Sequence, residues 1–175
     1  MDIRLLTPDD AGPYQDLRLR ALQESPTAFG NSYAEEAARA LGEVGARLIC
    51  DPGSGKAVFG AFLDDQLVGM VALVREQPAK VRHRAELGGL YVSPGARGQG
   101  IGAALLDTAL GHARSLPDLR KVKLSVTSGN GPAERLYLSR GFERYGSEPE
   151  GLFVDGVYYD ELLYQLCLTP RGDGR

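Results

Sequence analysis

The stretch LYVSPGARGQGIGAALL, residues 90–106, decides how this chain folds. It begins as an apolar strand ending at Val92, turns through residues 93–95, and leads through three closely spaced glycines into an apolar helix. Glycines at a strand-to-helix junction let backbone N–H groups approach a ligand because no Cβ intervenes. The first N–H groups of the helix have no partner within it, and the helix dipole favours negative charge there. The stretch therefore predicts a cradle for a phosphate-bearing cofactor, to which Arg97 adds a positive charge.

A nicotinamide-dinucleotide site is one interpretation of this cradle. The fingerprint G-x-G-x-x-G/A is formally satisfied by Gly98, Gly100 and Ala103. In that motif, however, the first glycine closes the turn directly after the strand, whereas five residues separate Val92 from Gly98 here. The motif also places a carboxylate at the end of the next strand, which here ends near Thr127. The spacing disfavours this interpretation.

The same loop resembles the GNAT superfamily of acyl-CoA-dependent N-acyltransferases, whose motif Q/R-x-x-G-x-G/A is matched by Arg97, Gly100 and Gly102. Residues 130–142, NGPAERLYLSRGF, resemble the family's second hallmark: an Asn before a helix, an Ala, a Leu-Tyr pair, and a Gly-Phe that opens the next strand. The two motifs occur in the family's order and at its usual separation. The resemblance covers residues 2–168.

The resemblance implies an α/β fold with a central mixed, mostly antiparallel sheet flanked by helices. We expect one domain over residues 1–169 and a disordered tail at 170–175. The hydrophobic periodicity gives the same order of elements. It predicts strands at 2–6, 57–63, 67–75, 84–92, 121–127, 142–147 and 157–168, with a polar turn at 148–151. It predicts helices from Thr7-Pro8, over 33–49, after Gly98 and over 132–140. The helix between strands 84–92 and 121–127 predicts that these two strands are parallel.

Bulk properties narrow the class of protein. The chain has 175 residues, 43% of them hydrophobic and 25% charged, as in an ordinary soluble domain. Its net charge is −3 and it has no basic tract, so we expect neither nucleic acid nor membrane as a partner. The N-terminus lacks an apolar signal core, which predicts a cytoplasmic location. Cys50 and Cys167 form no ligand-spaced pair, and His83 and His112 are isolated, so we expect no metal site.

Acetyl-CoA is the co-substrate that the resemblance implies, and it assigns two groups of binding residues. The central strand would hydrogen-bond the pantetheine arm through main-chain atoms of Leu90 and Val92. An interior glycine pair, Gly88-Gly89, is typical of a bulge or a close backbone approach at this point. The full set of expected cofactor-binding residues is Leu90, Tyr91, Val92, Arg97, Gly98, Gln99, Gly100, Ile101, Gly102 and Asn130.

Acyl transfer to an amine needs a base, an oxyanion donor and a proton for the departing thiolate. Tyr137, of the Leu-Tyr pair, is the expected acid, because a phenol with a pKa near 10 stays protonated at neutral pH; the alternative is a core tyrosine with a satisfied hydroxyl. Glu86 is the expected base, since strict alternation would put it on the same face as Leu90 and Val92. The alternative for Glu86 is a surface ion pair. A backbone N–H, that of Val92, is the expected oxyanion donor.

The acceptor side is expected to be lined by the first two helices and the last two strands. Aromatic side chains beside carboxylates suit a protonated amine, although the same residues could simply form a helix–sheet core. We predict substrate contacts from Phe29, Tyr33, Tyr159 and Asp160. Asp160 and Glu161 are also alternatives to Glu86 for the base role, or candidates for amine recognition.

These features together predict an N-acetyltransferase that moves an acetyl group from acetyl-CoA to a primary amine by direct attack in a ternary complex. The acceptor would be a small-molecule or peptide amine. The alternative is a module of the same fold that binds acyl-CoA without turning it over. A homodimer is a further possibility that the resemblance implies.

Overall fold

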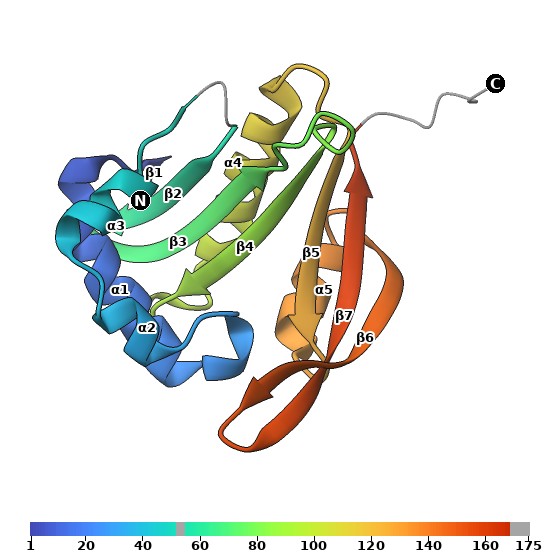
Figure 1. Ribbon diagram of the computed structural model, residues 1–175. Coiled ribbons are helices and arrows are strands. Elements are labelled where there is room, and N and C mark those ends of the chain that lie inside the picture. The colour runs from blue at the N-terminus through green and yellow to red at the C-terminus, as the bar shows by residue number, and fades with distance from the viewer. Residues whose placement is uncertain (52–54, 169–175) are drawn as a thin grey trace.

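A computed structural model describes residues 1–51 and 55–168. The expected tail at 170–175 lies outside the described residues. Seven strands form a single sheet in the order β1-β2-β3-β4-β5-β7-β6 (Figure 1). The strands are β1 Asp2–Leu5, β2 Ala57–Leu63, β3 Gln66–Arg75, β4 Arg84–Val92, β5 Lys121–Thr127, β6 Glu143–Val154 and β7 Val157–Cys167. The helices are α1 Ala11–Glu24, α2 Tyr33–Ala37, α3 Leu41–Arg47, α4 Ile101–Ser115 and α5 Gly131–Leu138. The mixed, mostly antiparallel sheet flanked by helices is confirmed.

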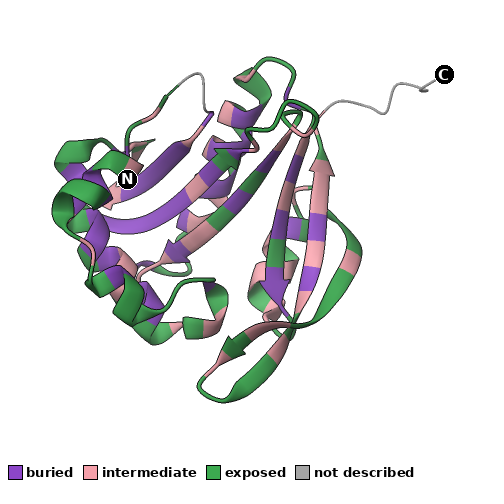
Figure 2. Cartoon of the chain, viewed as in Figure 1, coloured by how far each residue is buried: buried purple, intermediate pink, exposed green. Residues whose placement is uncertain are grey.

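Helices cover both faces of the sheet, and each face has its own apolar core (Figure 2). On one face α4 buries Leu105, Leu106 and Leu110 against β2–β5. On the other, α1 buries Leu17 and Leu22 against β2 and β3. Because β2 and β3 are covered on both sides, they are almost continuously apolar, as fully buried strands should be.

The sheet opens between its two parallel strands. The pair β4–β5 is parallel, as predicted, and all other pairs are antiparallel. Only residues 84–86 of β4 pair with residues 121–123 of β5. Beyond Glu86 the two strands diverge (Figure 1), and residues 86–90 of β4 and 125–127 of β5 line a cleft in the middle of the sheet.

A bulge in β4 changes which side chains face this cleft. Met70 pairs with Tyr91 and Ala72 with Gly88, so β4 carries one extra residue, and Gly89 there has a φ of +64°. Leu87 and Leu90 consequently pack on the same, α4-facing core, although three residues apart. The expectation that Glu86 shares a face with Leu90 and Val92 is therefore wrong: the extra residue reverses the alternation between them.

Two predicted elements have different boundaries. The helix expected over 33–49 is two helices, α2 and α3, because the backbone of Ala40 is extended and interrupts it. The Ala40 N–H donates a hydrogen bond to the Glu43 carboxylate at 3.2 Å, which caps the start of α3. The turn expected at 148–151 lies within β6, which continues to Val154 through a register shift. The hairpin turns instead at Asp155-Gly156, where both residues have positive φ, the geometry that an Asp-Gly pair favours.

The first helical segment also begins differently. Thr7 caps a 3-10 turn over Pro8–Asp10, and the α-helix starts only at Ala11. The Asp10 carboxylate accepts a hydrogen bond from the Thr7 N–H at 2.8 Å and pairs with Arg4 at 2.7 Å. This pairing lowers the pKa of Asp10 to about 2.

Candidate active site

The loop between β4 and α4 has the conformation that a phosphate cradle requires. Gly98 and Gly100 have φ values of +78° and +77°, which other residues adopt only with strain. A Cβ built on either would meet no protein atom within 4 Å, so it would project into open space above the loop. The N-terminus of the fifteen-residue helix α4 opens at the same place. Exposed backbone N–H groups and the positive end of a long helix suit a pyrophosphate.

A groove of about 550 Å³ runs from this loop to α5. Most of the predicted cofactor-binding residues line it, and Gln99 is not among them. The lining residues from that prediction are Leu90, Tyr91, Val92, Arg97, Gly98, Gly100, Ile101, Gly102 and Asn130. Asn130 also caps α5, since its side-chain oxygen accepts a hydrogen bond from the Ala133 N–H at 3.3 Å.

Arg97 and Tyr91 are tied to one carboxylate at the edge of the groove. The Tyr91 hydroxyl donates to Glu24 Oε2 at 2.7 Å, and Arg97 Nη2 lies 3.4 Å from the same oxygen. Arg97 Nε also donates to the Val92 carbonyl at 2.8 Å. The Tyr91 ring itself belongs to the α1-side core, and burial together with Glu24 raises the pKa of Tyr91 to about 12. The positive charge of Arg97 is thus held beside the end of β4.

The backbone of β4 faces the cleft at alternate residues. Val92 is paired with Gly69, and the neighbouring Ser93 N–H donates to the Val68 carbonyl at 2.8 Å. Because bonded and non-bonded pairs alternate in an antiparallel ladder, Val92 turns its N–H and C=O away from β3. The same alternation turns the backbone groups of Leu90 toward the cleft. This is the arrangement in which main-chain atoms of both residues can bind an extended ligand.

Tyr137 lies on α5 at the inner end of the groove. Its side chain is 7% exposed and packs edge-to-face on Phe142, with the ring centres 5.7 Å apart. In the described part of the chain the structure shows no hydrogen-bond partner for its hydroxyl, which opens onto both grooves. Burial raises the pKa of Tyr137 to about 12, which keeps the phenol protonated at neutral pH.

A second groove, of about 470 Å³, approaches Tyr137 from the other side of the sheet opening. Glu86, Arg18 and Glu161 line it. The residues that line both grooves are Ala28, Phe29, Leu90, Asn130, Ala133 and Tyr137. The two grooves therefore meet at the tyrosine.

The predicted acceptor residues divide between different places. Phe29 lines both grooves, whereas Tyr33 lines a separate hollow with Phe153. Asp160 accepts a hydrogen bond from the Glu150 N–H at 2.9 Å, and neither it nor Tyr159 lines the second groove.

Glu161 does line it, and its carboxylate accepts a hydrogen bond from Ser125 Oγ at 2.8 Å. Arg18 was missed from the sequence. In the sequence Arg18 is marked only by its position one helical turn after Tyr14. That position does not reveal that the Arg18 side chain reaches Gly89 at the bulge of β4.

These features define an opened sheet that two grooves enter, one of which carries a cradle suited to a phosphate-bearing cofactor. The sequence matches the model of the Acetyltransferase (GNAT) family over residues 17–142, and the chain belongs to this family.

Individual relatives agree with this assignment. The chain is 30% identical over 94 residues to a spermidine N(1)-acetyltransferase of Vibrio cholerae, which covers 54% of this chain and 53% of that protein. The structure resembles a ribosomal-protein-alanine N-acetyltransferase from Brucella melitensis with a TM-score of 0.83 and 27% identity, covering 96% and 100% of the two chains. It shares its fold with a phosphinothricin acetyltransferase from Sinorhizobium meliloti solved in complex with AcCoA, with a TM-score of 0.82 and 22% identity over 95% and 88% of the chains.

The chain spans between 23% and 62% of the length of the curated relatives with which it aligns. Among the described residues, no helix is long and apolar enough to cross a membrane.

Proposed function

We propose that this protein is an N-acetyltransferase that transfers the acetyl group of acetyl-CoA to a primary amine by direct attack in a ternary complex. The observation that carries the proposal is the meeting of the two grooves at Tyr137, which lets a cofactor and an acceptor reach the same hydroxyl from opposite sides. Family membership supports the acetyltransferase class.

Acetyl-CoA is the co-substrate, and the residues of the first groove fit it. The open cradle at Gly98 and Gly100 would hold the pyrophosphate through backbone N–H groups. The outward-facing main chain of Leu90 would bind an amide group of the pantetheine arm, because the Val92 C=O is already bonded by Arg97 Nε and the Val92 N–H is reserved for the thioester carbonyl. When bound, acetyl-CoA supplies an activated thioester.

The chain's own residues would then move two protons and stabilise one developing charge. Glu86 would take a proton from the acceptor ammonium, directly or through a water molecule. The Val92 N–H would stabilise the negative charge that develops on the carbonyl oxygen. The second proton of the attacking nitrogen would reach the departing sulfur through Tyr137, whose hydroxyl gives its proton to the sulfur as the C–S bond breaks and regains one from the new amide nitrogen.

Direct attack is favoured over a covalent acyl-enzyme by the placement of the thiols. Cys50 and Cys167 line neither groove, and Cys167 is exposed on β7. No cysteine is therefore placed to accept an acyl group at the junction of the grooves.

The acceptor class is a primary amine on a small molecule or a peptide. Two acidic side chains, Glu86 and Glu161, line the acceptor groove and would attract a protonated amine. The names of two relatives, a spermidine and a ribosomal-protein acetyltransferase, illustrate that both kinds of acceptor occur among related proteins. A cytoplasmic location and a homodimer stay predictions from the sequence.

Thermal unfolding in the presence of saturating acetyl-CoA, NAD or NADP tests the cofactor. A ligand at about 100 times its Kd adds roughly 2.7 kcal/mol, which raises the Tm of a domain of this size by about 5–10 °C. A shift with acetyl-CoA alone is expected; a shift only with a nicotinamide dinucleotide would contradict the proposal.

A screen of amines for release of free CoA then tests transfer. Binding without release on any amine would favour the non-catalytic alternative.

A further inference from the structure

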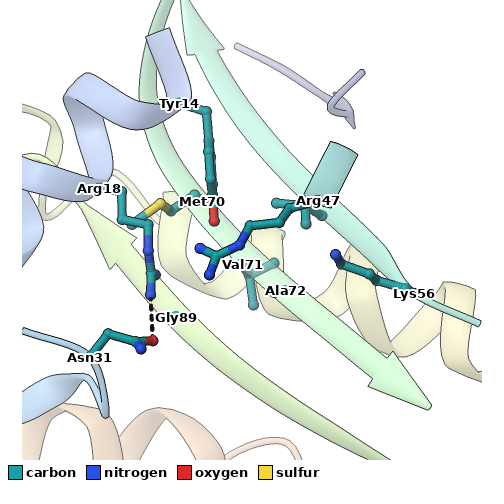
Figure 3. Close-up of a pocket in the computed structure, with 10 residues that line it drawn as sticks. Tyr14, Arg18, Asn31, Arg47, Lys56, Met70, Val71, Ala72 and Gly89 are labelled. Carbon is teal, nitrogen blue, oxygen red and sulfur yellow. Dashed lines mark hydrogen bonds between the residues drawn. The ribbon is translucent and has the colours of Figure 1, made fainter. Parts of the chain in front are cut away.

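A third hollow, of about 280 Å³, opens beside the acceptor groove on the α1 face of the sheet (Figure 3). It lies between α1, the end of α3 and strands β2 and β3. Figure 3 shows Tyr14, Arg18 and Arg47 converging on one space in front of Met70–Ala72, with the Lys56 side chain directed toward it. The proposed transfer reaction does not use this hollow.

The hollow carries an excess of positive charge. The Glu36 carboxylate behind it is fully buried and is shared by three guanidiniums: Arg47 at 2.9 Å, Arg18 at 3.2 Å and Arg39 at 3.4 Å. One carboxylate thus faces three guanidiniums, and the hollow itself is lined by Arg18, Arg47 and Lys56 with no acidic side chain among its described lining residues.

The Lys56 ammonium lines the same hollow as the guanidiniums of Arg18 and Arg47. Burial and, secondarily, the charge of Arg47 lower the pKa of Lys56. Cationic side chains that line one partly buried space favour the binding of an anionic group there.

The hollow adjoins the acceptor groove at the bulge of β4. Arg18, Asn31 and Gly89 line both spaces. Gly89 has no side chain to separate them, and Arg18 Nη1 lies only 3.8 Å from the position that a Cβ on Gly89 would take. The charges in the two spaces are separated by sign. Arg18 and Arg47 line the hollow, whereas the carboxylates of Glu86 and Glu161 line the acceptor groove.

We propose that this hollow binds the carboxylate of the acceptor, so that the acceptor is an amino acid whose amine lies in the groove beside Tyr137. The inference rests on the proposed function and names its substrate class. Arg47 and Arg18 would pair with the carboxylate, and guanidinium groups suit this role because they bind carboxylates through parallel N–H donors. The Tyr14 hydroxyl, directed into the same space, is a further donor.

A purely structural role for the cluster makes a different prediction. If the three arginines only fix α2 and α3 to α1 through Glu36, then replacing either Arg39 or Arg47 should lower stability without changing the choice of acceptor. Arg39 contacts the same carboxylate but does not line the hollow. Arg39→Gln is therefore the matched control for Arg47→Gln, since each removes one ion pair to Glu36 and only the second changes the lining.

The experiment compares acceptors in matched pairs: each common L-amino acid, its carboxamide, and O-phosphoethanolamine as an amine with a phosphate. With the wild-type protein we expect kcat/KM at least tenfold higher for one or more acids than for the corresponding amides. Arg47→Gln should raise KM for those acids about tenfold or more with little change in kcat and no change for the amides. Arg39→Gln should keep the wild-type preference.

Calorimetric titration of the protein with the same amino acids and amides, without acetyl-CoA, gives a readout independent of turnover. Binding that needs the carboxylate and is lost in Arg47→Gln supports the inference even if no transfer is observed, which would then count against the proposed function alone. Equal use and equal binding of acids and amides would overturn the carboxylate site while leaving the transferase intact. Preference for O-phosphoethanolamine, or identical behaviour of Arg39→Gln and Arg47→Gln, would also overturn it.

Discussion

Replacing Tyr137 by phenylalanine separates the role of this residue in catalysis from its role in the core. The substitution removes only the hydroxyl, which no described residue hydrogen-bonds, and it keeps the edge-to-face contact with Phe142. The free energy of unfolding should therefore change by no more than about 0.5 kcal/mol. Turnover should fall by about a hundred- to ten-thousandfold, the usual contribution of a general acid. Such losses raise the activation free energy by about 2.7–5.4 kcal/mol.

Tyr164→Phe is the matched control, because it deletes a hydroxyl from a second buried tyrosine outside both grooves. The Tyr164 hydroxyl donates to Glu134 Oε2 at 2.7 Å, so its removal should cost about 1–2 kcal/mol of stability. Its effect on turnover should be small. Tyr137→Phe should therefore lower the steady-state release of CoA with little change in urea unfolding. Tyr164→Phe should lower stability in urea unfolding with little change in the release of CoA.

The pH dependence gives a second check on the same residue. Because burial raises the pKa of Tyr137 to about 12, its hydroxyl stays protonated throughout the range in which the protein can be assayed. Activity should therefore show no alkaline loss from Tyr137 below about pH 11. An unchanged kcat in Tyr137→Phe, or a loss of activity matched by an equal loss of folded protein, would refute the reasoning.

Other substitutions test the cradle and two ion-pair sites. Gly100→Ala should cost about 1–2 kcal/mol of stability, because φ there is +77°, and should weaken the acetyl-CoA-dependent rise in Tm. The control Gly111→Ala lies within α4 and faces open space, so it should instead stabilise the protein by up to about 1 kcal/mol. The pKa of Asp10 is lowered to about 2 mainly by its hydrogen bond to Arg4, so the stabilisation is present above about pH 4 and is lost as the pH falls toward 2. Arg4→Gln should remove that dependence, worth about 1–2 kcal/mol after screening at the partly exposed arginine, as measured by denaturant unfolding between pH 2 and 5. Glu36→Gln should cost about 3–5 kcal/mol in urea unfolding, because it leaves its guanidinium partners without their shared carboxylate.

The sequence predicted the elements whose signals are local. Strands β2 and β5 have the expected boundaries, and the parallel pairing of β4 and β5 follows from the helix between them. The cradle was also predictable, because glycine spacing and the start of a helix act over a few residues. Asn130, as the cap of α5, was readable from its position before Gly-Pro.

The errors arose where long-range contacts decide the geometry. The glycine pair in β4 indicated a bulge, yet its effect on Glu86 depends on where β3 loses register, which periodicity alone does not reveal. The cationic hollow was invisible for a similar reason, since Arg18 and Arg47 lie on different helices and meet only through Glu36. Each looks like an ordinary surface charge in the sequence.

The opening of the sheet also explains why this site should bind an extended ligand. Beyond Glu86, β4 has no strand on its β5 side, so its outward N–H and C=O groups lack ladder partners. Buried backbone groups without partners are costly, and Arg97 Nε already bonds one of them, the Val92 carbonyl. A ligand whose own amide groups lie along β4 would satisfy the others, as an added strand does at a sheet edge. Gly89, at the bulge, lines the same groove as Tyr137, so a ligand extended along this edge would bring its reacting end toward that residue.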